Sequence, residues 1–361
     1  MNQVLFADAR VRGLGADYTL PCKFRRLLKR LDLASTVRGR TAAIKMHFGG
    51  NVGYSTVHPV FVRILAEEIR KAGARQVSVM DWGTGGAVGR GYTEEVLGVP
   101  VTTCYGQDEG DLVRKRIGFR SLAYARYGRR IWETDVFVGL AHVKGHGNAA
   151  FGGAIKNVGM GTVDPRTRAA VHGLEGGIIW HAERCIHCKR CIRECRYDAN
   201  SFDPAGNYQI DYHSCTLCQH CILSCPKAAL ELDARNWGAM QEGLARVAAA
   251  FLKHLKANSA LFINVLTDIT IYCDCWGMTT PNLVPDVGIL AGRNIVAVEK
   301  ASLDRIKASK LMPQGLPVGY KLARRKGHLF ERITGKDPYV QVRMLDRLGF
   351  GPQDYRIVRV E

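Results

Sequence analysis

Eight of the chain's twelve cysteines fall in one segment, in two runs with the same spacing. The first run, CIHCKRCIREC, spans residues 185–195, and the second, CTLCQHCILSC, spans residues 215–225 and precedes Pro226. Each run reads C-x2-C-x2-C-x3-C, and the first three thiolates at that spacing can each ligate one iron of a cubane. Structural zinc usually takes pairs of ligands separated by a longer loop. The spacing therefore predicts two [4Fe–4S] clusters, with a pair of zinc sites as the alternative.

Residues 179–233 closely resemble the bacterial-type ferredoxin domain. In that family the fourth cysteine of each run ligates the other cluster. The resemblance assigns one cluster to Cys185, Cys188, Cys191 and Cys225, and the other to Cys195, Cys215, Cys218 and Cys221. Arg196 stands where the family often has proline, which weakens the turn but not the ligation. The resemblance also implies electron transfer between the clusters and sensitivity to oxygen, as expected of an anaerobic protein.

The rest of the chain alternates between strand and helix patterns. Strands are expected at 4–11, 41–48, 76–83, 135–146 and 260–273, helices at 22–34, 58–73 and 240–255, and a strand leading into a helix at 294–309. This alternation predicts an α/β host with a largely parallel sheet and an inserted small α+β ferredoxin-like domain. The expected division is a host in two parts, 1–178 and 234–361, around the inserted domain at 179–233. An insertion favours a fixed geometry between clusters and host.

Composition limits the classes of partner and compartment. A hydrophobic fraction of 47% and a mean hydropathy of -0.10 indicate a globular chain. No run approaches the roughly 18 apolar residues that span a bilayer, and the first residues lack a signal pattern, so a cytoplasmic protein without membrane contact is expected. A net charge of +18, with basic clusters at 23–30, 114–116 and 321–326, is compatible with a solvated surface or with the attraction of anions, an acidic redox partner or nucleic acid. No nucleic-acid motif accompanies the charge, and the oligomeric state stays open.

Polar side chains follow several of the expected strands. They are Lys45 and His47, then Asp81 before the turn WGTGG, then His142, Lys144 and His146, and finally Asn264 and Asp268. The carboxyl ends of parallel strands meet at one edge of a sheet, where ligands bind in open α/β folds. The pattern therefore predicts a Lys/His-lined site for a small anionic substrate at this edge.

Two further segments extend the candidate site. The glycine-rich stretch 145–161 offers backbone amides and carries Lys156, which could hold a phosphate or carboxylate or form a covalent adduct with a cofactor. It is not a P-loop, because Asn157 follows the lysine. Cys273 and Cys275 share a face if extended, and they could ligate a metal, form a redox pair, lie beside a cluster or be buried and inert.

The combination of these motifs resembles the domain-of-unknown-function 362 family. The resemblance rests on the Lys45/His47 strand, residues 142–161, the inserted quartets, CDCWG (273–277), PDVGILA (285–291) and AVEKAS (297–302). A more distant similarity is to nickel-pincer lactate racemases, in which a histidine, a lysine and a second histidine follow in the order of His146, Lys156 and His172. That similarity implies a pyridinium-derived cofactor on Lys156, nickel on His172 and an acid/base role for His146.

Several functions are compatible with these residues. The first is an iron–sulfur oxidoreductase with catalytic groups among Lys45, His47, His142, Lys144, His146 and Lys156. The second is an electron carrier or docking protein without its own catalysis. A racemase-like or metal-dependent acid/base enzyme, with His172, Cys273 and Cys275 as candidate metal ligands, is a third. The sequence leaves open an additional metal or organic cofactor at the host site. The net charge also permits an RNA-modifying reductase, but no motif requires one.

Overall fold

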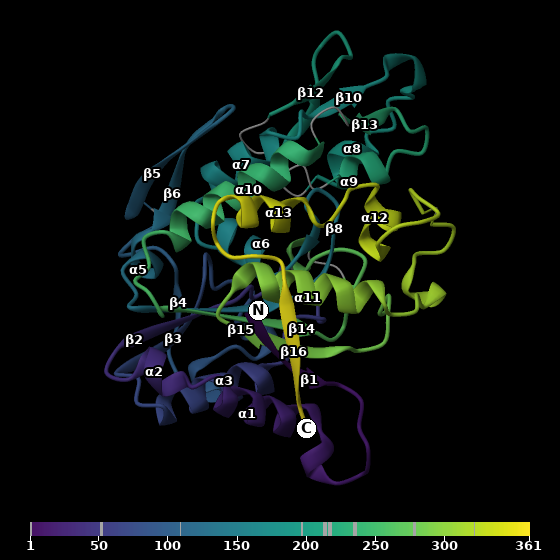
Figure 1. Ribbon diagram of the computed structural model, residues 1–361. Coiled ribbons are helices and arrows are strands. Elements are labelled where there is room, and N and C mark those ends of the chain that lie inside the picture. Colours follow the sequence, from purple (N-terminus) through teal and green to yellow (C-terminus); the bar gives the residue numbers. More distant parts are fainter. Residues whose placement is uncertain are drawn as a thin grey trace.

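A mixed sheet runs through the middle of the molecule, with helices on both faces (Figure 1). The structure is a computed structural model, and it describes residues 2–50, 53–108, 110–195, 198–211, 215, 219–233, 237–276, 279–320 and 322–361. Arg196 and Cys218, which the sequence analysis singled out, lie outside the described residues.

The main sheet has eight strands among the described residues. In spatial order they are β16 (Tyr355–Val360), β1 (Asn2–Asp8), β15 (Gly288–Gly292), β14 (Ala260–Leu266), β7 (Val136–His142), β2 (Thr41–Lys45), β3 (Gln76–Asp81) and β4 (Val101–Thr103). β15 pairs antiparallel with both of its neighbours, and the other pairs are parallel. The predicted α/β fold with a largely parallel sheet is confirmed.

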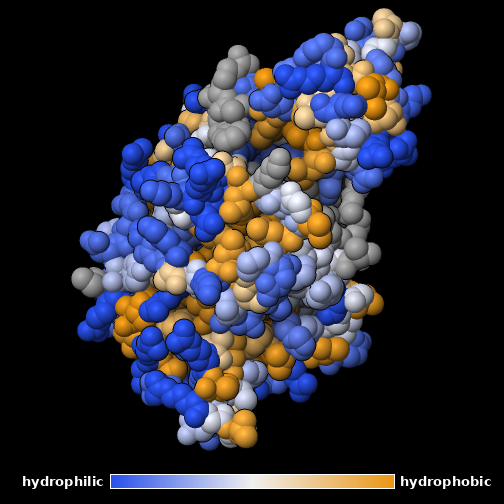
Figure 2. Space-filling view, turned by 90° about the vertical axis from the view of Figure 1, so that its right-hand side faces the viewer, coloured by the Kyte–Doolittle hydropathy of each residue, from blue (hydrophilic) through white to orange (hydrophobic). Residues whose placement is uncertain are grey.

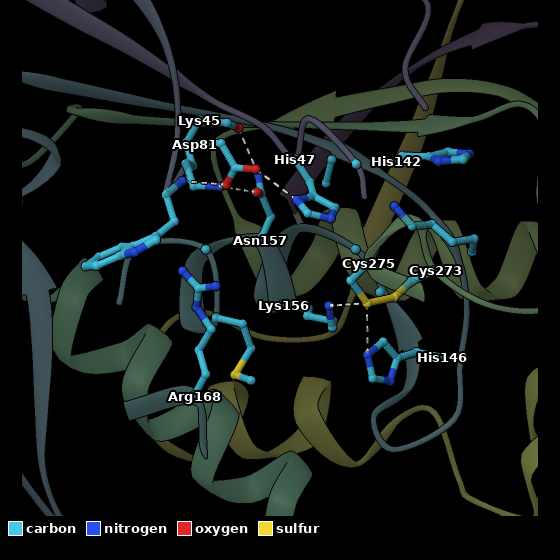
Figure 3. A pocket seen from close by; sticks show the side chains of 18 of the residues that line it. Lys45, His47, Asp81, His142, His146, Lys156, Asn157, Arg168, Cys273 and Cys275 are labelled. Atoms are coloured by element: carbon cyan, nitrogen blue, oxygen red, sulfur yellow. Dashed lines mark hydrogen bonds and ion pairs between the residues drawn. A yellow bond between two sulfur atoms is a disulfide. The ribbon is translucent and has the colours of Figure 1, made fainter. Parts of the chain in front are cut away.

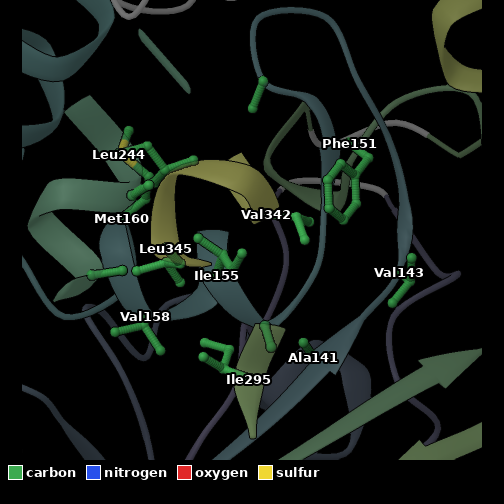
Figure 4. Close-up of a cluster of buried hydrophobic side chains, with 14 of the residues drawn as sticks. Ala141, Val143, Phe151, Ile155, Val158, Met160, Leu244, Ile295, Val342 and Leu345 are labelled. Atoms are coloured by element: carbon green, nitrogen blue, oxygen red, sulfur yellow. The ribbon is translucent and has the colours of Figure 1, made fainter. Parts of the chain in front are cut away.

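Helices cover each face of this sheet and bury a separate core. One face carries α1 (Leu20–Arg30), α2 (Leu33–Val37) and α3 (Pro59–Lys71), and the other carries α6 (Ala154–Gly159), α10 (Trp237–Leu252), α11 (Ile295–Lys307) and α13 (Val340–Arg347). β7 is buried at every position, as expected for a central strand covered on both sides. Figure 4 shows Ile155 and Val158 of α6 among side chains from α10, α11 and α13.

The ends of α3 illustrate why the sequence predicted its helices well. His58 accepts a hydrogen bond from the backbone N–H of Val60 at 3.2 Å, and Pro59 occupies the first turn. At the other end Gly73 adopts a φ of +91°, in the region that favours glycine. The helix predicted at 58–73 is therefore present with nearly the expected bounds.

Three predicted strands differ from the structure. The strand expected at 135–146 breaks after His142, and Lys144–His146 forms β8, which pairs with β9 (Ala150–Gly152) in a separate sheet. The strand expected at 260–273 ends at Leu266. Residues 294–309 contain no strand, because the Asn294 side chain accepts from Ala297 N at 3.0 Å and caps α11. The start of α11 is apolar because this helix packs against β14 and β15. A short apolar run of this kind also fits a buried strand, which is why the sequence predicted one.

The cysteine-rich segment forms its own small elements. These are β10 (Ile178–Trp180), α8 (Arg190–Arg193), β11 (Asn200–Phe202), β12 (Tyr208–Ile210), α9 (His220–Leu223) and β13 (Leu230–Leu232). β10 pairs antiparallel with β13, so the two ends of the segment lie side by side. The segment projects from the top of the molecule in both views, and Figure 2 shows hydrophobic residues gathered across the middle of the face below it. This arrangement is compatible with an inserted domain, whose boundaries at 179 and 233 stay a prediction.

Short elements complete the fold around the site. They are α4 (Glu94–Leu97), β5 (Leu112–Phe119), β6 (Leu122–Gly128), α5 (Arg129–Trp132), α7 (Pro165–Gly173) and α12 (Leu329–Thr334), with single 3-10 turns at Ala16–Tyr18, Val88–Arg90, Ala182–Arg184, Asp274–Trp276 and Pro313–Gly315. Within the part of the chain that the structure describes, no helix is both long and apolar enough to cross a lipid bilayer.

Candidate functional site

A cavity of about 450 Å³ opens at the carboxyl ends of β2, β3 and β7. Most of the side chains that the sequence analysis proposed for this edge line it, namely Lys45, His47, Asp81, His142, Lys144, His146, Lys156, His172, Cys273 and Cys275. Asn264 does not, because its amide donates to Glu299 and Ser302 behind the sheet. Asp268 is also absent from the lining. The structure thus brings together residues spread over more than half of the chain.

Asp81 organises one wall of the cavity. Its carboxylate accepts from Lys45 Nζ and lies against His47 Nδ1, both at 2.9 Å, and it also accepts from the backbone N–H of Phe48 at 3.0 Å. Burial opposes the charge, but Lys45 and His47 hold the pKa of Asp81 well below its usual range. Lys45 is fully buried and bound by this carboxylate. It is therefore not a free cation for a ligand.

His47 keeps one nitrogen for the cavity. Its Nδ1 faces Asp81, whereas its Nε2 has no hydrogen-bond partner among the described residues. Burial lowers the pKa of His47, although Asp81 raises it in part. A neutral imidazole oriented by a carboxylate can accept or donate a proton near neutral pH.

Asp274 organises a second group of residues beside the cavity. It accepts from Lys144 Nζ at 2.6 Å and lies 3.1 Å from His142 Nδ1. Burial raises the pKa of Asp274, but Lys144 and His142 outweigh it and lower the pKa below its usual range. The other ring nitrogen of His142 faces the Thr267 carbonyl at 2.8 Å. Lys144 and His142 are therefore held by partners, and Figure 3 shows His142 at the edge of the view, away from Lys156.

Lys156 of α6 points into the cavity (Figure 3), whereas the neighbouring Ile155 is buried in the hydrophobic core. Its Nζ lies 4.0 Å from Cys275 Sγ, and it forms no ion pair with a carboxylate among the described residues. Burial, followed by the nearby charge of Lys144, lowers the pKa of Lys156 to about 7. This amine can therefore bind an anion when protonated and exchange a proton near neutral pH.

The two histidines of the racemase resemblance also reach the cavity. His146 Nδ1 accepts from the backbone N–H groups of Asn148 and Ala149, each at 3.1 Å, so the neutral ring carries its proton on Nε2. Burial and the charge of Lys156 lower the pKa of His146 well below its usual value. The same two causes lower the pKa of His172 to about 3, and its Nδ1 has no partner among the described residues. Both rings are therefore neutral at physiological pH.

Cys273 and Cys275 form a disulfide in the wall of the cavity (Figure 3). His146 and the two sulfurs lie within 4.8 Å of one another, a grouping that can hold a metal ion. However, disulfide sulfurs are not thiolates, and the proton on His146 Nε2 faces Cys275 Sγ at 3.8 Å. The structure therefore holds this pair as a disulfide, and a role in metal binding or redox chemistry stays a prediction.

Sequence reasoning did not propose three residues that shape the cavity. Asn157 accepts from Lys45 Nζ at 3.1 Å and donates to the Lys45 carbonyl at 2.8 Å, which fixes α6 against β2. Arg168 of α7 reaches into the cavity, and its guanidinium lies 5.2 Å from the ring centroid of Trp82. Asn157 could have been proposed from the sequence, because it is a polar residue next to Lys156 in a glycine-rich stretch. No local sequence pattern indicates Arg168 or Trp82.

Two glycines are required by close approach rather than by flexibility. A Cβ on Gly145 would collide with the carbonyl oxygen of Ile271, and Gly145 N donates to the Thr270 carbonyl at 3.0 Å. This contact holds β8 against the segment that leads to Cys273. A Cβ on Gly161 would collide with the Lys45 ammonium group. The glycine-rich stretch is therefore a packed wall of the site.

A second, smaller cavity lies among the cysteines of the quartets. Its volume is about 20 Å³, and the cysteines that line it are Cys185, Cys188, Cys191 and Cys225. The set combines three cysteines of the first run with the fourth of the second, which is the ligand set that the ferredoxin resemblance assigns to one cluster. Pro226 also contributes to the lining.

The fourth cysteines of the two runs have matching surroundings. Cys195 Sγ accepts from the backbone N–H of Ala199 at 3.3 Å, and Cys225 Sγ accepts from that of Ala229 at 3.2 Å. Cys195 also packs with Cys215 in one small apolar cluster, in keeping with their predicted assignment to the other cluster. Backbone N–H groups directed at sulfur favour the thiolate and tune cluster potentials. These residues are therefore suited to hold [4Fe–4S] clusters.

Comparison with curated proteins finds a partial relative. A stretch of 48 residues is 38% identical to the pyruvate synthase subunit PorD of Methanocaldococcus jannaschii. The match spans 13% of this chain and 56% of that subunit, so the chain covers little more than half of its length.

Comparison with solved structures finds two distant likenesses. The lactate racemase apoprotein from Thermoanaerobacterium thermosaccharolyticum is 14% identical with a TM-score of 0.34, over 73% of this chain and 51% of that one. A structural genomics protein from Thermotoga maritima is 12% identical with a TM-score of 0.37, over 70% and 51% of the two chains. The chain thus spans about half of each structure, and at these scores neither likeness bears on chemistry.

A family match covers most of the chain and includes the cavity residues from Lys45 to Cys275. It extends over residues 42–304, and the family is described as Domain of unknown function (DUF362). The protein therefore belongs to the DUF362 family.

Proposed function

We propose that this protein is an iron–sulfur oxidoreductase. Electrons pass through two [4Fe–4S] clusters, held by the cysteine quartets, to a small anionic substrate in the 450 Å³ cavity. The observation that carries the proposal is Lys156, a basic side chain without a carboxylate partner among the described residues, in a cavity lined by further basic groups.

The cluster half of the proposal is supported by the arrangement of the quartets. Cys185, Cys188, Cys191 and Cys225 line one small cavity although they come from two separate runs. The partial match to a pyruvate synthase subunit adds to this support. When bound, the clusters supply one-electron transfer at low potential. The chain's own contribution is the thiolates and the backbone N–H groups directed at Cys195 and Cys225.

The substrate half of the proposal is supported by the charge of the cavity. Its described lining contains Lys156 and Arg168, together with Lys45 and Lys144, whose charges are offset by Asp81 and Asp274. Basic groups in a partly enclosed space attract anions more strongly than the same groups in bulk water. A carboxylate or phosphate group of moderate size is therefore the expected ligand.

Roles within the cavity follow from which groups have partners. Lys156 is proposed to bind the anion, and His47 to move a proton through its Nε2. Lys45, Lys144 and His142 are held by Asp81 and Asp274, so they are positioning residues. His146 and His172 are neutral neighbours of Lys156. An acidic redox partner is proposed to dock on the exposed basic residues of β5, Arg114, Lys115 and Arg116.

Anaerobic purification followed by iron analysis and anion titration tests this function. We expect about eight irons per chain and binding of inorganic phosphate or acetate to the isolated protein. Lys156→Ala should weaken anion binding by at least about tenfold, as for the loss of a charge-assisted contact. Lys29→Ala, on the exposed surface of α1, is the matched control and should not. Clusters without any anion binding would instead support a carrier or docking protein without its own catalysis.

A second candidate is a racemase-like or metal-dependent acid/base enzyme. It is favoured by one observation, since His146, Lys156 and His172 line the same cavity. Intact-mass spectrometry and metal analysis separate the two functions. A covalent addition on Lys156, or a metal other than iron bound in the cavity, would favour this second candidate.

A further inference from the structure

The Cys273–Cys275 disulfide has two unequal sulfurs. Cys273 is buried, with 1% of its surface exposed, whereas Cys275 is the more exposed of the two and faces Lys156 and His146. The two cysteines are separated by one residue. A loop this short restricts the unfolded chain far less than a long one does, so the bond adds little conformational stability. Because the disulfide lines the cavity, a chemical role is the better explanation for it.

Two donors converge on Cys275 Sγ from different elements (Figure 3). Lys156 Nζ approaches to 4.0 Å from α6, and His146 Nε2 approaches to 3.8 Å from β8. The His146 ring cannot turn its proton elsewhere, because its Nδ1 accepts from Asn148 N and Ala149 N. A disulfide sulfur is a weak acceptor, whereas a thiolate is stabilised by a neighbouring cation and an N–H donor. The surroundings of Cys275 are thus suited to the sulfur after the disulfide has been reduced.

The wall also holds the disulfide in place. Gly145, next to His146, packs directly on the Ile271 carbonyl, and Asp274, between the two cysteines, is held by Lys144 and His142. Reduction can therefore break the S–S bond without releasing Cys275 from its donors. A fixed dithiol beside a substrate cavity is the arrangement that thiol–disulfide exchange requires.

We propose that Cys273–Cys275 is a redox-active disulfide, and that its reduced form transfers two electrons to a small anionic disulfide bound in the cavity. This inference rests on the proposed function for its source of electrons. One electron from each of two reduced [4Fe–4S] clusters breaks the S–S bond. One proton from solvent completes the Cys273 thiol, and Cys275 remains a thiolate beside the protonated Lys156. Cys275 and Cys273 are the reacting residues, and Lys156 and His146 are positioning residues for the thiolate.

The transfer to substrate balances in two exchange steps. Cys275, as the thiolate, attacks one sulfur of the substrate, forms a mixed disulfide and releases the first substrate thiolate. Cys273 passes its proton to the first substrate thiolate, attacks Cys275 Sγ, re-forms the original disulfide and releases the second substrate thiolate. The basic lining, with Lys156 and Arg168, is expected to favour a substrate that carries carboxylate groups.

Differential alkylation of the full-length protein tests the disulfide directly. In oxidised protein, N-ethylmaleimide should leave Cys273 and Cys275 unmodified, and dithiothreitol should expose both, as read by peptide mass spectrometry. After reduction, Cys275 should react about tenfold faster at pH 7 in wild-type protein than in Lys156→Gln, in which no ammonium group stabilises the thiolate. The pH midpoint of alkylation should rise in Lys156→Gln and return in Lys156→Arg. Cys104, a buried thiol, serves as the unreactive internal standard.

Two chromogenic disulfides test the substrate class. For each probe we compare the reaction rate of reduced wild-type protein with that of reduced Lys156→Gln. The ratio of these rates should be larger with the dianionic 5,5′-dithiobis(2-nitrobenzoate) than with the uncharged 2,2′-dithiodipyridine. Equal factors for the two probes would overturn the proposed anionic substrate. Lys29→Gln, an exposed change of the same charge, should behave as wild type with both.

Failure of this inference can be told from failure of the proposed function. Alkylation of Cys273 and Cys275 in oxidised protein would overturn the redox pair. Binding of one zinc per chain that is lost in Cys275→Ser would also overturn it. Neither result would affect the proposed clusters or the proposed anion binding. Reduction of the cluster-loaded protein by methyl viologen radical should open the disulfide. In Cys188→Ser, which lacks a predicted cluster ligand, the same treatment should leave the disulfide closed. A disulfide that opens with dithiothreitol but not through intact clusters would overturn this inference, whereas protein without iron would overturn the proposed function.

Discussion

Lys144 donates to Asp274 over 2.6 Å although 130 residues separate them in the chain. Both side chains are more than nine-tenths buried, and the contact joins β8 to the segment that carries the disulfide. An ion pair in this position costs desolvation, and it persists because His142 and Lys144 together match the carboxylate. The ion pair therefore holds in place the segment that carries Cys275.

Removing the carboxylate of this pair should destabilise the protein. Asp274→Asn leaves Lys144 buried without its counter-ion, and the expected loss in the free energy of unfolding is about 3–5 kcal/mol. Chemical denaturation in urea measures it. Glu133→Gln, in an exposed ion pair with Arg129, is the control and should leave the unfolding midpoint unchanged. An equal effect in both variants would contradict the importance given to burial.

Anion binding in the cavity should depend on pH through Lys156. Because the pKa of Lys156 is lowered to about 7, its ammonium group is present below that pH and is lost as the pH rises through it. Phosphate affinity should therefore fall between roughly pH 6 and pH 8. Titration calorimetry at several pH values measures the affinity for phosphate. A parallel series with acetate separates the effect of Lys156 from the second ionisation of phosphate, because acetate keeps its charge over this pH range. Lys156→Arg, which stays charged, should show no such fall with acetate.

Double substitutions in the quartets should reveal the exchange of ligands between them. If Cys225 shares a cluster with Cys185, then Cys185→Ser combined with Cys225→Ser removes one cluster and leaves about four irons per chain. Cys185→Ser combined with Cys195→Ser should remove both clusters. Iron and sulfide analysis of anaerobically purified protein gives the counts. The reverse pattern would show that each quartet holds its own cluster.

Gly145→Ala should disturb the wall that carries the disulfide. The new Cβ meets the Ile271 carbonyl, so the two segments must separate at a cost of about 1–3 kcal/mol. A fall in the midpoint of thermal unfolding measures the effect. Gly238→Ala in α10 is the control, since its Cβ meets nothing within 4 Å, and it should be neutral or slightly stabilising. A stable Gly145→Ala protein would mean that the wall can yield.

Several features of this protein could be predicted from local sequence because local physics produces them. Pro59 and Gly73 punctuate α3, and the alternation of strands and helices gave the largely parallel sheet. The strand expected near residue 294 was wrong, because a helix buried against β14 and β15 needs an apolar run that also suits a strand. The single strand expected at 135–146 was wrong because β8 pairs with β9 and leaves the main sheet.

The sequence by itself determined the cysteine spacing, the family motifs and the edge of the sheet where basic residues gather, since these follow from short-range periodicity and from the parallel order of strands. Only the tertiary structure decided which of those basic residues is left for a ligand. Lys45 and Lys144 are bound by Asp81 and Asp274, while Lys156 faces Cys275. The reason is that charge pairing and disulfide formation depend on distances between residues remote in sequence, and folding sets those distances.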